Sequence, residues 1–258
     1  MTSSELQKLE ALEEVQLLRE EVSDAERCLE LLSDYSLWTR ARDEDSIVTY
    51  YRDSQSEFLV RGEAVIQASV FRILAMFSEE DLLPMLFPSL SQAVKLHSFT
   101  PYRTLTQYRY RLPWPIHDRE LCVATSVYPV VESKSCLIVE RTPLRSHYLG
   151  FPVPALSPGS VAMSVATSCM NIMYIEEELT QVTLIISADP NIVPFTQTFL
   201  PATLTNYVAQ QEVFTIMQTI RTQADHFEQG PYFARISSRP DYYAAMQTQL
   251  EAYLKLFR

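Results

Sequence analysis

The order of helical and strand-like segments predicts an α+β fold built on an antiparallel sheet. Strand-like segments are grouped in one run between residues 97 and 188, and helical segments lie before and after them. Grouped strands favour an antiparallel sheet, whereas strictly alternating strands and helices would favour a parallel one. The connections at 132–134 and 177–179 are short, and only antiparallel neighbours can be joined by such short connections.

Residues 3–33 are predicted to form a long acidic helix. Its apolar residues recur at alternating steps of four and three, which places one stripe along the helix: Ala11, Val15, Leu18, Val22, Ala25, Leu29 and Leu32. We expect this stripe to pack on the helix's own domain. A heptad stripe is also compatible with a coiled-coil dimer, and the spacing leaves that alternative open.

The next segments are predicted to form a hairpin and two short helices. Residues 46–53 and 56–65 are rich in β-branched and aromatic residues, with a polar break between them, which indicates a β-hairpin. Residues 66–77 return to helical spacing. Ser78 and Asp81 have the spacing of a capping box, so a further short helix is expected to begin there and to be ended by prolines.

The central run is predicted to contain five strands, at 104–112, 119–131, 135–142, 160–176 and 180–188. Between the third and fourth, the segment 143–159 holds four prolines and two glycines. Such a composition is incompatible with regular structure and predicts a long irregular loop.

Helices are predicted to end the chain. Residues 201–227 carry apolar residues at helical spacing, and Pro201 suits a first turn. This long amphipathic helix is the expected cover for one face of the sheet. A break at 229–231 separates it from a last helix at 241–257.

Composition and spacing exclude several classes of function. A net charge of −11 argues against nucleic-acid binding. The four glycines are isolated, which argues against phosphate-binding loops. The four cysteines and four histidines show no metal-ligand spacing, and no nucleophile elbow occurs. We therefore expect no metal, no cofactor and no enzymatic activity. Reduced cysteines and the lack of a signal-peptide pattern favour the cytoplasm.

The segment 113–120 places prolines, an aromatic residue and charges where one strand ends and the next begins. Charges at such a position need partners when they are buried. One interpretation is an ion-pair turn at the strand end. The other is that Arg119 turns inward and holds the polar group of an otherwise apolar ligand, because a planar guanidinium grips phosphate or carboxylate.

The chain resembles the START family of lipid-binding domains in three respects. Residues 109–123 look like the family's strand, Pro-x-Pro element and Arg–acidic pair, with Arg119 and Glu120 as that pair. Residues 181–200 are similar to the family's last strand, its Asp-containing turn and the proline before the final helix. The order of the elements is the third resemblance.

The resemblance covers about residues 34–227. It leaves 1–33 as an N-terminal amphipathic helix packed on the domain and 228–258 as a C-terminal helical extension. It implies a helix-grip fold, in which a curved antiparallel sheet wraps around the long C-terminal helix and an apolar tunnel between them holds one lipid.

The resemblance also implies roles for individual residues. Arg119 takes a head-group role, as the matching Arg does in phospholipid-binding members. Sterol-binding members carry an Arg in the strand that follows, and 120–131 contains none. Candidate tunnel-wall residues on the long helix are Leu204, Val208, Val213, Met217 and Ile220. Candidate gate residues in the 143–159 loop are Tyr148, Leu149, Phe151, Val153 and Leu156.

We therefore expect an intracellular, monomeric protein that binds and transfers a lipid, preferably a phospholipid, and touches membranes transiently. A sterol-binding member of the family is an alternative. A lipid-sensing or scaffolding module, whose terminal helices bind a protein partner, is another. A hydrolase or cyclase on the same fold is a third.

Overall fold

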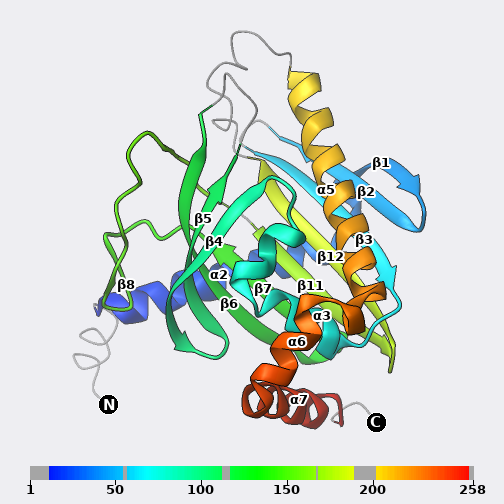
Figure 1. The fold of residues 1–258 in the computed structure, drawn as a ribbon. Coiled ribbons are helices and arrows are strands. Elements are labelled where there is room, and N and C mark those ends of the chain that lie inside the picture. Colours follow the sequence, from blue (N-terminus) through cyan, green and yellow to red (C-terminus); the bar gives the residue numbers. More distant parts are fainter. Residues whose placement is uncertain (1–11, 55–56, 112–116, 167, 189–201, 256–258) are drawn as a thin grey trace, which may run out of the picture.

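The computed structural model describes residues 12–54, 57–111, 117–166, 168–188 and 202–255. In this part of the chain a large curved sheet is covered on one face by the long helix α5 (Ala202–Asp225) and on the other by α2 (Glu13–Ser33) (Figure 1). Three shorter helices, α3 (Val70–Phe77), α6 (Pro231–Ser238) and α7 (Pro240–Lys255), gather at one end of the sheet.

The main sheet has the strand order β1-β2-β3-β12-β11-β7-β6-β5-β4, and all neighbours along this path are antiparallel. The strands are β1 (Thr39–Glu44), β2 (Ile47–Asp53), β3 (Phe58–Ile66), β4 (Leu90–Thr100), β5 (Arg103–Tyr110), β6 (Arg119–Val130), β7 (Ser135–Arg141), β11 (Ser168–Glu176) and β12 (Leu179–Ala188). The pairing of β3 with β12 joins the N-terminal hairpin to the rest of the sheet. The predicted α+β class with an antiparallel sheet is confirmed.

Strands β1 and β4 lie outside the predicted strands. In β1 the side chains are mostly charged and exposed, so the strand carries no apolar alternation. In β4 the register with β5 shifts at three places. Each shift moves the side chains to the opposite face, which breaks the period of two that strand prediction depends on.

The prediction of one strand over 160–176 is wrong. The segment instead contains β10 (Val161–Ala162) and, after a break, β11. β10 pairs in parallel with the first residues of β6, Arg119 and Glu120. That side of β6 is open because β7 pairs with β6 only from Ala124 onward.

The expected capping box at Ser78 is also wrong. Ser78 ends α3, and its hydroxyl donates to the carbonyl of Leu74 at 2.8 Å. The next segment is a 3-10 helix, η2 (Glu80–Met85), with Pro84 inside it. Proline lacks the backbone donor that a continuing α-helix needs, which explains the short, tight helix.

The helix α5 packs closely on β2 and β3 at Gly62. A Cβ atom on Gly62 would lie 2.6 Å from Val213 Cγ1 and 2.9 Å from Met217 Cγ. Such distances are far below van der Waals contact, so glycine is the residue that allows this approach. The extension after α5 contains η4 (Phe227–Gln229), α6 and α7, where a single helix was predicted.

The helix α2 lies on the opposite face of the sheet, where Leu17, Cys28 and Leu31 are buried. The predicted apolar stripe is not the buried face, because Leu18, Val22 and Leu29 remain 41%, 52% and 36% exposed. Ion pairs explain the orientation. Acidic side chains of α2 face basic residues of the sheet: Glu20 and Asp24 pair with Arg141, and Glu21 pairs with Arg103. Among the helices of the described ranges, none is long and apolar enough to cross a membrane.

Candidate functional site

We call the side of the sheet that α5 covers the inner face, and the side that α2 covers the outer face. The inner face and α5 form one apolar cluster. It includes Ala64, Leu121, Val123, Ile138, Met170, Ile172, Val182, Leu184, Phe214, Met217 and Ile220. The outer face carries separate clusters with α2 and with the 143–153 segment. The candidate site is the inner face, because the largest of these three apolar clusters lies there, between the strands and α5.

Arg119 lies on the inner face at the start of β6. Leu121 and Val123 belong to the inner cluster and Cys122 to the outer one, and successive strand residues alternate between faces. Arg119 is only 1% exposed, and its Nη1 donates to the carbonyl of His117 at 2.8 Å. The structure therefore places this guanidinium on the side of the sheet where the sequence interpretation needed it, in a nearly closed environment.

Its neighbour Glu120 points to the outer face and fastens a loop. Its carboxylate accepts from the backbone N of Ser157 at 3.2 Å, from the Ser157 hydroxyl at 3.1 Å and from Arg109 at 3.3 Å. Burial raises the pKa of Glu120, but the hydrogen bonds from Ser157, Ser160 and Arg109 outweigh it, so the pKa lies below its usual value. The side chains of Arg119 and Glu120 thus lie on opposite faces of the sheet.

The inner face also holds a polar cluster around Glu140 in β7. Glu140 accepts from the hydroxyl of Tyr108 at 2.9 Å and from that of Ser168 at 3.0 Å. Burial raises the pKa of the Glu140 carboxyl, against the lowering effect of these two hydrogen bonds. Burial likewise raises the pKa of Tyr110, next to the cluster.

Sequence reasoning did not single out Glu140. A signal existed in the alternation of β7. Cys136 and Ile138 face the inner side, and the period of two puts Glu140 on the same face. An acidic residue at an inward position of an otherwise apolar strand is a candidate for a functional group.

The predicted wall residues of α5 fall into two groups. Val213, Met217 and Ile220 are buried, and the last two belong to the inner cluster. Val213 and Met217 lie against Gly62. Leu204 and Val208 stand in the first turns of α5, where the backbone is described and the side chains are not. A role of these five residues as a lipid-contacting wall stays a prediction.

The predicted gate residues lie mostly on the outer face. The 143–159 segment contains a small hairpin of β8 (His147–Tyr148) and β9 (Phe151–Pro152), so the prediction of a wholly irregular loop is wrong. Tyr148 is fully buried and donates to Glu21 of α2. Leu149, Phe151 and Val153 pack beside it on Leu105, Cys122 and Ala124.

The end of the 143–159 segment differs from its buried part. Leu156 is 41% exposed, and the next residue, Ser157, is held by Glu120. The sheet therefore separates the buried part of the loop from α5, and the exposed part lies near the start of β6.

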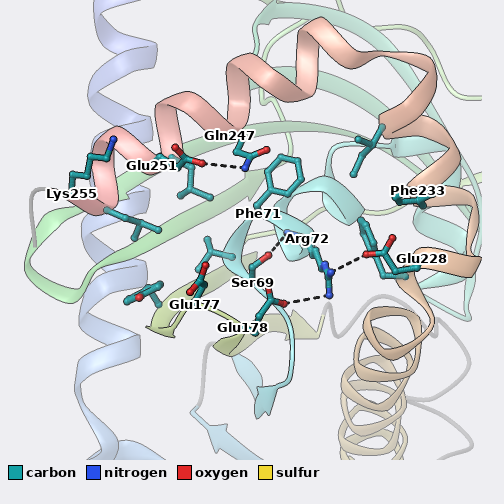
Figure 2. A pocket seen from close by; sticks show the side chains of 16 residues that line it. Ser69, Phe71, Arg72, Glu177, Glu178, Glu228, Phe233, Gln247, Glu251 and Lys255 are labelled. Atoms are coloured by element: carbon teal, nitrogen blue, oxygen red, sulfur yellow. Dashed lines mark hydrogen bonds and ion pairs between the residues drawn. The ribbon is translucent and has the colours of Figure 1, made fainter. Parts of the chain in front are cut away.

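A pocket of about 560 Å³ lies at one end of the inner face, between α3, the β11–β12 turn, α6 and α7 (Figure 2). Apolar side chains such as Phe71, Ile236 and Leu250 line it together with charged ones. Arg72 is held between Glu178 at 3.3 Å and Glu228 at 2.8 Å. These pairs tie the C-terminal extension to α3 and to the β11–β12 turn.

Within the described ranges, no group of His, Cys, Asp and Glu side chains could hold a metal ion. The four cysteines are free and buried. Burial raises the pKa of Cys136 to about 11, which keeps this thiol protonated and weakly nucleophilic.

Among the comparisons with known proteins, the solved structures bear on the fold. No protein-family model and no curated protein match the sequence. Among solved structures, human StAR-related lipid transfer protein 5 superposes with a TM-score of 0.70 at 12% identity, over 83% of this chain and 99% of that one. A STAR-related lipid transfer protein fragment from Xanthomonas axonopodis has a TM-score of 0.59 at 15% identity, over 73% of this chain and 99% of that one.

Human STARD10 is a third similar structure, with a TM-score of 0.62 at 11% identity, over 79% of this chain and 80% of that one. At such low identities the likeness defines the fold. The chain has a START-like helix-grip fold, as the sequence resemblance predicted.

Proposed function

We propose that this protein binds one lipid molecule, without covalent change, in a hollow between α5 and the inner face, and carries it between membranes. The START-like fold supports this function, since similar structures include proteins named for lipid transfer. Most of the apolar inner cluster would then serve both as the core and as the wall around the lipid.

The observation that carries the proposal is that the apolar inner face, which α5 covers, also holds the half-buried polar side chains of Tyr110 and Glu140. Burial dominates the pKa shift of both side chains, as it does for groups surrounded by protein. Both nevertheless keep part of their surface open. We propose that this open surface of Tyr110 and Glu140 faces the space in which the ligand is held.

The apolar part of the ligand supplies the binding free energy. Each CH₂ group that leaves water contributes about 0.8 kcal/mol. Two acyl chains are therefore ample to hold a lipid inside the protein, and the polar groups of the inner face decide which head group is accepted.

A phospholipid is the favoured ligand because Arg119 lies on the inner face. A guanidinium binds phosphate through paired donors. In the structure its Nη1 is engaged with the carbonyl of His117. Because a guanidinium has five N–H donors, this hydrogen bond is compatible with a further one from Arg119 to a phosphate.

A lipid with a hydroxyl group, such as a sterol, is a second candidate. The cluster of Tyr108, Glu140 and Ser168 supports it. A protonated carboxyl donates as well as accepts a hydrogen bond, and burial raises the pKa of Glu140, which favours that form. That property suits a neutral hydroxyl better than an anionic phosphate.

We propose the exposed end of the 143–159 segment and the first turns of α5 as the parts that move for lipid entry. Leu156 is the exposed predicted gate residue, and Ser157 is bonded to Glu120, which is adjacent to Arg119. Movement of this end would release the start of β6 without disturbing the part of the loop that packs against α2.

Vesicle-to-vesicle transfer of a fluorescent phospholipid tests the proposal. Arg119→Ala should lower the binding constant by about ten- to a hundredfold, as expected for a hydrogen bond to a charged group. Arg40→Ala, which changes an exposed arginine of the edge strand β1, is the matched control and should leave transfer unchanged.

Glu140→Gln separates the two candidate ligands. It should weaken uptake of a fluorescent sterol more than uptake of the phospholipid if the Glu140 cluster holds a hydroxyl. No transfer of either lipid by the wild-type protein, at concentrations where vesicles alone show none, would contradict the proposed function.

A further inference from the structure

The helix α2 carries an apolar stripe that the domain leaves partly uncovered. Leu18 and Val22 are 41% and 52% exposed, and Leu29 is 36% exposed. Val15, Ala25 and Leu32 continue the stripe and are half-buried, and Ala25 and Leu32 also contact the outer cluster along one edge of the stripe. At 100° per residue, this stripe is centred about 120° around the helix from the face that Leu17, Cys28 and Leu31 bury in the sheet.

The spacing of the stripe fits another helix. Its members alternate by steps of three and four from Val15 to Leu32. This heptad spacing is the pattern of a coiled-coil seam, in which side chains of one helix insert between those of a second. Packing against a sheet edge or a flat surface does not require this spacing.

We propose that a second copy of this chain covers the stripe, with the two α2 helices antiparallel. In this pairing Leu18 faces Leu29 of the second copy, and Val22 faces Ala25 of the second copy. The small Ala25 at the centre allows the helices to approach closely. The arrangement has twofold symmetry, so each contact occurs twice.

The charges beside the stripe favour this direction. Arg19 follows Leu18 and Glu26 follows Ala25, so both lie along the same edge of the stripe. In the antiparallel pair, Arg19 of each copy faces Glu26 of the other. A parallel pair would instead bring Glu21 toward Glu26 of the second copy, and Glu21 is already engaged with Arg103 and Tyr148.

One helix stripe is smaller than a standard interface of about 800 Å² per partner. We therefore expect a weak dimer that dissociates on dilution. The face of α2 that binds the sheet stays in place, so each subunit keeps its fold and its inner face. The pairing is independent of the proposed lipid site.

Sedimentation of the full chain from about 1 µM to about 500 µM tests the proposal. The mass should rise from 29.7 kDa toward twice that value. Val22→Glu should abolish this rise while the melting temperature at low concentration stays that of the wild type, because Val22 is exposed in the monomer. Leu144→Glu changes a residue that is 86% exposed elsewhere and should leave the dimer intact.

A charge exchange distinguishes the antiparallel pairing from other contacts. Arg19→Glu alone and Glu26→Arg alone should each weaken the dimer by about tenfold, because each creates like-charge pairs. An equimolar mixture of the two variants should restore it, since opposite charges then face each other at both positions. Failure of the mixture to restore the dimer would overturn the antiparallel pairing.

A wild-type chain that remains monomeric across the whole range would overturn the proposal. A Val22→Glu variant that dimerises as the wild type does would also overturn the proposal, because the contact would then lie on another surface.

Discussion

Replacing Gly62 by alanine tests how tightly α5 is held on the sheet. The new Cβ would lie 2.6 Å from Val213 Cγ1 and 2.9 Å from Met217 Cγ, whereas carbon atoms rest about 3.5–4.0 Å apart. One partner must therefore move by about 1 Å. Val213 and Met217 are 3% and 0% exposed, so neither has free space to enter. We expect a loss of about 1–3 kcal/mol in the free energy of unfolding.

Urea denaturation measures this loss, and a double variant tests its cause. Val213→Ala alone should destabilise the protein by leaving a cavity. In Gly62→Ala/Val213→Ala the new methyl occupies part of that cavity, so the double variant should be more stable than the sum of the single losses predicts, by about 1–2 kcal/mol.

The matched control is Val65→Ile, which adds a carbon to an exposed position of the same strand and should change stability by less than about 0.5 kcal/mol. If Gly62→Ala is as stable as the wild type, or if the two single losses simply add, α5 does not grip β3 as described.

Three further predictions follow from the packing and the pKa shifts. Glu120→Gln should lower the free energy of unfolding by about 1.5–3 kcal/mol at neutral pH. Because the folded-state pKa of Glu120 is lowered, this loss should shrink as the pH falls through that pKa. A loss that does not change with pH in urea titrations would contradict the prediction. Glu140→Gln should become more stable relative to the wild type as the pH rises. The folded-state pKa of Glu140 is raised, so the wild type loses stability as this carboxyl ionises in the folded protein. Thermal melts at acid and mildly alkaline pH measure the difference, and the same change in melting temperature at both pH values would refute the prediction. Leu18→Asp should change the free energy of unfolding by less than about 0.5 kcal/mol, and Leu31→Ala should lower it by about 2–4 kcal/mol. The reason is that Leu18 is 41% exposed and Leu31 only 6%. The reverse order in denaturation experiments would mean that α2 packs through its heptad stripe.

The elements that the sequence predicted well are those whose pattern is local. The strands β6, β7 and β12 and the helix α5 follow their apolar periods closely. The strand β4 was missed because its bulges are set by pairing with β5, which no local pattern encodes. The 3-10 helix η2 differs from the expected α-helix because Pro84 falls inside it.

The orientation of α2 also depends on contacts that no local sequence pattern encodes. The heptad spacing identifies an apolar stripe correctly but does not say what covers it. Ion pairs with Arg103 and Arg141, which come from distant strands, turn a different face toward the sheet. Glu21 is thereby buried at 3% exposure, at a position where sequence alone would place a solvated residue.

The candidate site was predictable in part. Arg119 could be identified from the charged strand start and from the family resemblance, and the structure places it on the inner face. The cluster of Tyr108, Glu140 and Ser168 unites three strands. Its members become neighbours only through the register of the sheet, so their association depends on tertiary structure.

The central claim is that one intact lipid occupies the hollow between α5 and the inner face. Native mass spectrometry, after incubation with vesicles of mixed phospholipid and sterol and removal of the vesicles, tests it most directly. We expect a species of 29.7 kDa plus one lipid, with the lipid recovered unchanged on extraction, and less of it from Arg119→Ala than from Arg40→Ala. Protein that carries no lipid, or that releases a chemically altered one, would contradict the account.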